Sequence, residues 1–545
     1  MSMIARASSF FGKMGAFIGW GGAGRAYEAG SYDMPETSGW NPSVNFGDDE
    51  VLVNRDRIVA RARDLVKNNG FISGGMDRKA EAVIGSKIRL KAQPAYRAMG
   101  RDFDWAFKWS QDVQTAWKVY TMGVSRFCDA ERTKTFGMLV NTAYRHYFID
   151  GEALAVVDDI DRGSKYTTAM RLIDPDRLSN PTGVPDHHIL QNGNRIVGGV
   201  EIDQSHAPVA YHIRVAHPGD PAMSMDKFRW ERIPRYSPSG RPRVIHAFHA
   251  KRAEIRRGIS QLAEIILASK QMDRMDKATV NAALMQTIMA LFITSPAPTE
   301  EVAEAIAPTE TSASSSYFDT LVGIREKNKV RIGGEATAVH LIPGEKAEFK
   351  APTHPHNNFE AFMAQMLRKI ASTFGLSYPQ LSQDWAGINY SSARTLLNEI
   401  WRGLLDDRHV FTQMFCTPFY AAWLEEAIVL SRTITLPGGP LSYYRWKEEL
   451  TLCDWMGPGR GTVEPKKEQE AASIAIAGNR SSDSREAEAQ GLDYVEVYEE
   501  LANERKLRES LGLPDGDNAI PTGPGRPEEE NTDAADQREM EGADQ

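Results

Sequence analysis

The sequence lacks the features that mark membrane-spanning and disulfide-bonded proteins. Its 545 residues include only three cysteines, Cys128, Cys416 and Cys453, which lie far apart and fit no metal-ligand spacing. We therefore expect buried, free thiols and a reducing compartment. No run of about 18 apolar residues occurs, so no membrane-spanning segment and no membrane partner are expected.

A surplus of positive charge is also missing. The chain has 64 Lys and Arg against 73 Asp and Glu, which gives a formal net charge of -9. Proteins that bind nucleic acid tightly usually carry a basic surplus, because neutralising phosphates supplies most of the sequence-independent affinity. Any contact with DNA or RNA is therefore expected to be weak, transient or confined to a local patch.

Recognisable catalytic motifs are absent as well. The sequence contains no Gly-rich loop ending in Lys-Ser/Thr, no G-x-S-x-G and no H-E-x-x-H. Gly19, Gly21 and Gly24 match G-x-G-x-x-G by letter, but no apolar helix follows them, so dinucleotide binding is not favoured. We predict that the chain is not an enzyme, has no ATPase activity of its own and needs no cofactor.

Three short clusters raise the question of a metal site. Asp158, Asp159 and Asp161 could bind a divalent cation, but Asp and Gly are favoured in solvated hairpin turns in any case. Two histidine pairs could each supply two zinc ligands: His246 with His249, and His354 with His356. Nothing near either pair completes a four-ligand set. We favour a hairpin turn and ordinary surface or capping histidines, and no metal.

The first half of the chain predicts helices followed by a sheet. "MSMIARASSFFGKMGAFIGW" is interrupted by Lys13 and lacks a clean cleavage site, which favours a mobile or partner-docked arm over a signal peptide. Helical periodicity begins at Val51, with Gly70 as the expected stop, and returns in "FDWAFKWSQDVQTAWKVY". Short alternating runs between Ile149 and Phe248, such as "EALAVVDD", are punctuated by Gly, Pro, Asp and Asn and predict a mainly antiparallel sheet.

The second half predicts long helices. Gly258 to Thr294 contains no proline or glycine after its first residue, which predicts a helix of about 55 Å. A second helix with an apolar stripe is expected from Asn358 to Phe374. A third, whose stripe includes Leu396, Ile400 and Leu404, should continue toward Ile428 with a kink at Pro418. Small charged helices follow Gly461, and the acidic end is expected to be disordered.

Between the last two long helices lies "GLSYPQLSQDWAGINYSSAR", from Gly375 to Arg394. Gly375, Pro379 and Gly387 are expected to keep this polar, aromatic and nearly uncharged stretch out of either helix. Either Asn389 or Ser391 could cap the next helix. A cap does not explain the preceding dozen residues, and long loops inside compact domains are usually functional.

In order and spacing, several stretches resemble the lambda-like family of bacteriophage portal proteins. They are "ARARDLVKNNG", "ERTKTFGMLV", "IDPDRLSNP", "HLIPGEKAEF", "FGLSYPQLSQDWAGINYSSAR", "WLEEAIV" and "CDWMGPGR". Together they extend over most of the chain. One departure is "HAFHAKRAEIRRGIS", which is more basic than expected just before the first long helix.

The resemblance implies an α+β portal fold that assembles as a ring, usually of about twelve copies. The implied units are an N-terminal arm (1–50), a wing of helices and mainly antiparallel strands (51–257), a stem helix (258–294), a small α/β clip (295–356), a second stem helix (357–374), a tunnel loop (375–392), a kinked wing helix with a β return (393–460), a helical crown (461–515) and an acidic disordered tail (516–545).

The same resemblance implies a function and partners. The ring would lie at the unique capsid vertex of the virion after assembly in the host cytoplasm, and double-stranded DNA would be packaged and ejected through its channel. Implied partners are the terminase large subunit, which supplies the ATPase, head-completion or adaptor proteins, and major capsid and scaffolding proteins.

Particular residues follow from this placement. The predicted DNA tunnel residues are Gln383, Asp384, Trp385, Asn389, Tyr390, Ser391 and Arg394. The predicted clip residues for terminase docking are Arg325, Lys327, Lys329 and Arg331. Two alternatives remain: another head-tail connector or adaptor, disfavoured by the size and the long helix, and an enzyme with an aromatic lid loop.

Overall fold

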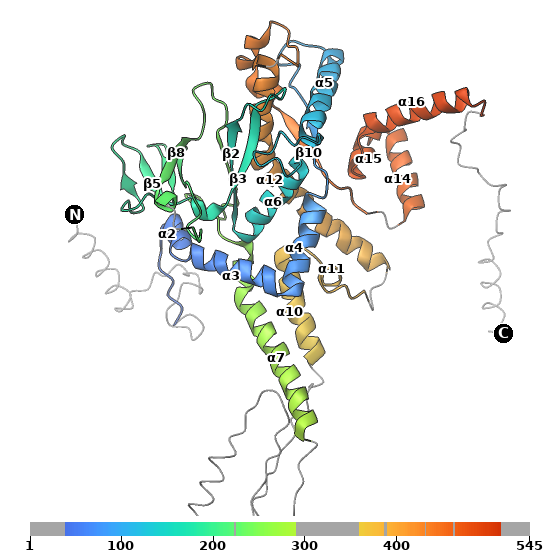
Figure 1. Ribbon diagram of the computed structural model, residues 1–545. Coiled ribbons are helices and arrows are strands. Elements are labelled where there is room, and N and C mark those ends of the chain that lie inside the picture. The colour runs from blue at the N-terminus through green and yellow to red at the C-terminus, as the bar shows by residue number, and fades with distance from the viewer. Residues whose placement is uncertain are drawn as a thin grey trace, which may run out of the picture.

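A computed structural model describes residues 39–222, 225–289, 359–385, 390–430, 432–461 and 464–513. Within these ranges the chain combines helices with small sheets, as expected for an α+β protein. In Figure 1 a body of sheets and helices carries two helices, α7 and α10, that project from its lower end. A group of helices, α14 to α16, lies at one side of the body.

From residue 39 onward, five helices precede the main sheets, and side-chain caps explain where three of them begin. They are α2 (Gly47–Leu52), α3 (Arg55–Asn68), α4 (Gly70–Val83), α5 (Phe103–Met122) and α6 (Phe136–Ile149). The side chains of Asn69, Asp102 and Thr135 accept hydrogen bonds from the first turns of α4, α5 and α6. The helix end predicted at Gly70 is confirmed, since α3 ends at Asn68 and Asn69 is its C-cap. Asn69 also caps a new helix, α4, whose first residue is Gly70.

All pairs of strands in the described residues are antiparallel. One sheet has the order β3-β2-β9, a second has the order β4-β5-β6-β7-β8, and β1 pairs with β10. The strands are β1 (Arg89–Ala92), β2 (Glu152–Asp159), β3 (Thr168–Ile173), β4 (His188–Ile189), β5 (Arg195–Val197), β6 (Val200–Ile202), β7 (Pro208–Arg214), β8 (Trp230–Pro234), β9 (Val244–Phe248) and β10 (Cys453–Met456). The antiparallel region predicted between Ile149 and Phe248 is confirmed.

Strand β2 is buried on both faces because it separates two cores. Ala153, Ala155 and Val157 belong to the larger core, which contains the helices. Leu154 and Val156 belong to a smaller core shared with the five-stranded sheet. Successive side chains of a strand point to opposite faces, so a strand between two cores needs apolar residues at consecutive positions. The expected alternation is therefore wrong for the "ALAVV" part of β2, where both faces are buried.

An aromatic cluster around Trp117 of α5 holds the larger core together. The centroid of its ring lies 5.0 to 6.0 Å from those of Phe136, Phe419, Tyr420, Trp423 and Trp455. These rings come from α6, α12 and β10. Each tilted or edge-to-face pair adds about 0.5–1.5 kcal/mol beyond the area that it buries. The cluster therefore joins the two halves of the sequence.

Within the part of the chain that the structure describes, three long helices lead into and out of the projecting part. They are α7 (Ile266–Met289), α10 (Phe359–Phe374) and α12 (Tyr390–Glu425), which contains Pro418 and continues into a π turn, η5 (Glu426–Leu430). The expectation that the first long helix starts at Gly258 is wrong. Ser260 begins a 3-10 turn, η4 (Gln261–Ile265), and α7 follows it.

The remaining short helices are η2 (Pro175–Arg177), η3 (Met225–Phe228), η6 (Pro440–Tyr444), α11 (Tyr378–Ser382), α13 (Lys447–Leu450), α14 (Pro465–Ala477), α15 (Asp483–Ala489) and α16 (Tyr494–Ser510). The small charged helices predicted after Gly461 are confirmed.

None of α14, α15 and α16 contributes a buried residue within the described ranges. Ion pairs attach this group to the body: Glu496 binds Arg89 at 2.9 Å and Lys118 at 2.6 Å. No helix in the described ranges is long and apolar enough to cross a bilayer.

The chain crosses itself very closely at two glycines, just before β2 and just before η4. Gly151 has a φ of +88°, and a Cβ on it would lie 2.3 Å from the carbonyl carbon of Ile259. A Cβ on Gly258 would lie 1.9 Å from the carbonyl oxygen of Gly151. Because these neighbours are backbone atoms, no side-chain rotation can relieve the clash. The crossing fixes the start of β2 against the residues that lead into the first long helix.

We predict that Gly151→Ala lowers the free energy of unfolding by about 3 kcal/mol or more, because it adds a backbone clash to left-handed strain. Gly183→Ala is the matched control: Gly183 has a φ of +82° and open space around it, so only the strain of about 1–2 kcal/mol remains. Chemical unfolding of both variants measures the difference. Equal losses would show that the crossing contributes nothing.

Candidate functional site

The segment from Gly375 to Arg394 joins the projecting helix α10 to α12, but it is not one continuous loop. Gly375, with a φ of +63°, follows the end of α10. Ser377 and Gln380 then form a capping box that starts α11. The prediction of a loop over 375–392 is therefore wrong at α11 and from Tyr390 onward. The capping box was visible in the sequence as "SYPQ", and Pro379 lies in the first turn, where proline is tolerated.

Three of the predicted tunnel residues lie on the described stretch after α11. Gln383 ends that helix in the left-handed conformation, with a φ of +60°. Gln383, Asp384 and Trp385 are all exposed, and half of the surface of Trp385 is accessible (50%). The hydroxyl of Tyr378 donates a hydrogen bond to Asp384 over 3.5 Å. The stretch therefore presents an exposed aromatic and polar surface.

The other four predicted tunnel residues differ from this pattern. Asn389 lies outside the described residues, whereas Tyr390 and Ser391 are the first two residues of α12. Because Ser391 lies inside the helix, the suggestion that it is the N-cap is wrong. Arg394 forms an ion pair with Glu464 at 3.7 Å, so its guanidinium already has a carboxylate partner just before α14.

The first half of α12 is only partly covered by the body: Leu404 belongs to the larger core, and Ile400 and Trp401 pack partly buried against it. The predicted apolar stripe forms a helix, but of Leu396, Ile400, Leu404 and Leu405 only Leu404 is buried. Periodicity predicted the helix correctly and did not predict what covers it. The predicted clip residues Arg325, Lys327, Lys329 and Arg331 lie outside the described residues, as do Gly19, Gly21, Gly24, His354 and His356.

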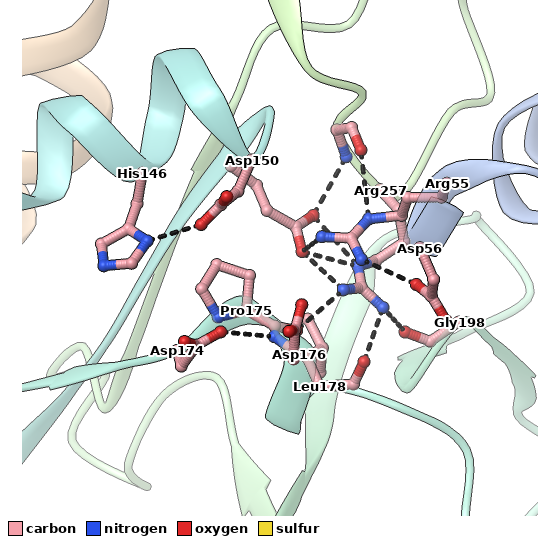
Figure 2. A network of polar contacts seen from close by, with 12 residues as sticks. Arg55, Asp56, His146, Asp150, Asp174, Pro175, Asp176, Leu178, Gly198 and Arg257 are labelled. Atoms are coloured by element: carbon pink, nitrogen blue, oxygen red, sulfur yellow. Dashed lines mark hydrogen bonds and ion pairs between the residues drawn. The ribbon is translucent and has the colours of Figure 1, made fainter. Parts of the chain in front are cut away.

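The basic stretch before α7 is used inside the protein. The Nε of Arg257 donates to both carboxylate oxygens of Glu152 at 3.0 Å, and its Nη1 donates to the carbonyl oxygens of Leu178 and Gly198. Figure 2 shows this guanidinium beside that of Arg55, whose Nη2 lies 2.8 Å from Glu152 Oε1. The departure from the family pattern therefore has a structural explanation.

Neighbouring Arg256 is also engaged. Its backbone N–H donates to Asp48 Oδ1 at 2.7 Å, and its Nη1 donates to Asp48 Oδ2 at 3.0 Å. Asp48 is fully buried at the start of α2. The two arginines therefore fix α2 and α3 against the residues that lead into α7.

The carboxylate of Glu152 is ionised although no part of it is exposed. Burial raises the pKa of this carboxyl, but the charges of Arg257 and Arg55 and a hydrogen bond from His246 outweigh burial and hold the pKa well below its usual value. Burial lowers the pKa of His246, whose side chain is 2% exposed and lies 3.1 Å from Glu152. The expectation of an ordinary surface or capping histidine is therefore wrong for His246, which is a buried partner of Glu152.

A second cluster contains possible metal ligands that the sequence did not signal. Asp174, Asp176 and His217 bring ligand atoms within 4.8 Å of one another. However, Arg63 lies 3.1 Å from Asp174 and 2.7 Å from Asp176, and its Nε contacts Asp150 at 2.8 Å. The guanidinium supplies the positive charge that these carboxylates need. The arrangement is therefore that of an ion-pair cluster.

The interpretation of Asp158, Asp159 and Asp161 as a hairpin is confirmed. Asp158 pairs with Arg171 at 2.7 Å and Asp159 with Arg241 at 2.6 Å, both at the end of β2. Asp161 Oδ1 accepts a hydrogen bond from the backbone of Gly163 in the turn to β3.

The three cysteines are buried and free, as expected. Burial raises the pKa of Cys128 and of Cys453 to about 12, so these thiols are protonated at neutral pH. Thiolates, not thiols, are the reactive form. The cysteines therefore act as small apolar groups.

Residues 34–408, more than half of the chain, match the family model described as phage portal protein, lambda family. The chain belongs to the lambda family of phage portal proteins. It is 29% identical over 484 residues to the portal protein of Escherichia phage N15, and 29% identical over 480 residues to portal protein B of Escherichia phage lambda. Each match covers 87% of this chain and 88% of the relative.

Among solved structures, the neck of a native gene transfer agent particle, computed with C12 symmetry, aligns over 82% of this chain and 94% of that chain, at 13% identity and a TM-score of 0.36. That similarity is too low to carry an argument about assembly. Membership of the portal family instead identifies a structural, non-enzymatic component of the phage virion that connects head and tail. It favours this function over the alternatives of an adaptor and of an enzyme with a lid loop.

We predict that Glu152→Gln lowers the free energy of unfolding at pH 7 by about 3–5 kcal/mol, because it leaves two buried arginines without their full counter-charge. Since the folded-state pKa of Glu152 is depressed, its contribution is complete above about pH 4.5 and is lost as the pH falls toward the folded pKa. Melting temperatures measured between pH 7 and pH 3 should therefore fall less steeply for the variant.

The control is Glu500→Gln, at an exposed position of α16. A parallel pH profile for wild type and Glu152→Gln would contradict the assignment.

Proposed function

We propose that copies of this chain form a closed ring at one vertex of the capsid, and that double-stranded DNA enters and leaves the head through its channel. The observation that carries the proposal is the family match over residues 34–408. The ring would hold about twelve copies, joined by heterologous contacts that close. Terminase, head-completion or adaptor proteins and the capsid and scaffolding proteins would bind this ring in turn.

Uncovered apolar side chains support association with further copies. On the long helices, Val280 of α7, Phe362 of α10 and Leu396 and Leu405 of α12 are exposed in the single chain. Twelve helices at a spacing of about 10 Å would form a circle about 38 Å across between axes. Subtracting the width of a helix leaves about 28 Å, which admits a DNA duplex. The projecting pair α7 and α10 would then be the stem.

The proposed units follow from this arrangement. Residues 51–257 would form the wing, residues 295–356 the clip that points out of the capsid, and residues 461–515 the crown inside it. The stretch from Gln383 to Trp385 would face the DNA.

Charge supports passage rather than capture of DNA. No lysine or arginine occurs between Gly375 and Ala393, and the net charge of the chain is -9. Each phosphate held by a cation adds affinity, and retained contacts would oppose sliding. The guanidinium of Arg394 is already paired with Glu464. A channel lined by such a segment would let the duplex slide.

Deleting Gln383 to Tyr390 tests the proposed channel segment. The deletion spares α11 and removes only the first residue of α12. We expect rings with a central hole in negative-stain images of both wild type and the deletion variant, and a large loss of nuclease-protected DNA in heads that carry the variant. Trp385→Ala should show the same effect in weaker form, whereas Leu441→Ala, at another exposed position, should not. A deletion variant that does not fold would show that the segment belongs to the core.

The proposed clip can be tested by charge reversal. Changing Arg325, Lys327 or Lys329 to Glu should weaken binding of terminase or of an adaptor protein, because acidic partners would then be repelled. Binding is measured on assembled rings at two salt concentrations, and ring formation in negative stain is the control. Unaltered binding would remove these residues from the interface.

A further inference from the structure

One face of α4 contacts both sides of the segment that joins α10 to α12. Gly75, Arg78 and Lys79 lie three and four residues apart, so they share a face of this helix. The first two contact the side formed by α10 and α11, and Lys79 contacts α12. Residues of α4, which is not part of the segment, therefore contact the helices on both sides of it.

The side formed by α10 and α11 rests on Gly75. A Cβ on Gly75 would lie 2.9 Å from Leu381 Cδ1 and 3.1 Å from the ring of Phe374. Leu381 and Phe374 are buried there, so α11 and the end of α10 pack directly on the backbone of α4. Arg78 Nη1 also donates a hydrogen bond to the carbonyl oxygen of Leu381 over 3.4 Å. A larger residue at Gly75 would push α11 away.

The α12 side is held by two consecutive charged residues. Lys79 Nζ lies 2.5 Å from Asp407 Oδ2, with the lysine side chain only 6% exposed. Arg408 Nε donates to the carbonyl oxygen of Val83 at 2.7 Å, and its Nη2 donates to that of Ala82 at 3.0 Å. These are carbonyls at the C-terminal end of α4, where a cation is favourable. Burial lowers the pKa of Arg408 to about 10, so it remains charged at neutral pH.

The amine of Lys79 lies between the two sides. A Cβ on Gly375, at the end of α10, would lie 3.4 Å from Lys79 Nζ. Within residues 394–406 of α12, only Leu404 is buried. Ile400 and Trp401 also pack, partly buried, against the larger core. Asp407 and Arg408 add an ion pair and hydrogen bonds that tie α12 directly to α4.

We propose that Lys79 and Gly75 are positioning residues: the face of α4 sets the angle between α10–α11 and α12, and so places Gln383, Asp384 and Trp385. The proposal rests on the proposed function, because it is in the channel that these three residues would act. Neither positioning residue contacts DNA in this arrangement. They act through the backbone directions of α11 and α12.

The test is a distance measured between spin labels in assembled rings, with labelled copies diluted by unlabelled ones. Labels attached to Gln383→Cys and Asn398→Cys report the two sides, since both positions are exposed and the three native cysteines are buried. In Lys79→Met, which keeps the length of the side chain and removes its charge, the main distance should shift and broaden. Lys79→Arg should restore much of the original distribution, and Gly75→Ala should shift it by displacing α11.

The matched control is Lys91→Met, which removes another lysine–carboxylate pair, to Glu488 at 2.6 Å, between the body and α15. It should leave the measured distance unchanged. The proposal is overturned if Lys79→Met and Gly75→Ala both leave the distance unchanged, or if Lys91→Met alters it equally. If Lys79→Met does not fold, Gly75→Ala decides alone.

DNA packaging separates this proposal from the proposed function. A shifted distance together with a loss of protected DNA supports both. A shifted distance with normal packaging would overturn the placement of Gln383 to Trp385 in the channel, while the role of α4 in setting the angle would stand.

Discussion

The structure depends most on one buried carboxylate, that of Glu152, and on the two arginines that neutralise it. Arg55 comes from α3 and Arg257 from the residues that lead into α7, so three distant segments meet at one charge. Arg257 also donates to the carbonyl oxygens of Pro175, Leu178 and Gly198. An unpaired charge at this depth would be very costly. The β-rich part and the projecting helix must therefore keep one relative position.

Close backbone packing acts with this charge network. Gly151 directly precedes Glu152 and Gly258 directly follows Arg257, so the tight crossing and the ion pairs occupy the same place. A second junction of similar design lies at α4, where a glycine admits α11 and an ion pair holds α12. In both places a glycine lets two segments of the chain pack at a short distance, and an ion pair fixes the direction in which the next helix runs. A protein that must present long helices at a defined angle needs such rigid joints.

Apolar and turn patterns predicted most elements of the fold, because those signals are local. The run "EALAVV" predicted β2, and helical periodicity predicted α5, α10 and α12. The errors have physical causes that are equally specific. Gly70 read as a helix stop, and α3 does end at Asn68, but the stop did not reveal that Asn69 caps a new helix, α4, at the same place. Pro379 read as a helix breaker although a capping box places it in a first turn.

The sequence by itself determined the family, the antiparallel region and the long helices. Only the tertiary structure decided what the basic residues do. Arg256, Arg257 and Arg408 could have been read as surface cations, but carboxylates and carbonyl groups from distant segments surround them. The partners of a charge are chosen by the fold. Asp48 lies 208 residues from Arg256, Glu152 lies 105 residues from Arg257, and the α4 carbonyl of Val83 lies 325 residues from Arg408. Local sequence cannot contain that information, whereas the period of a helix or strand can be read within a few turns.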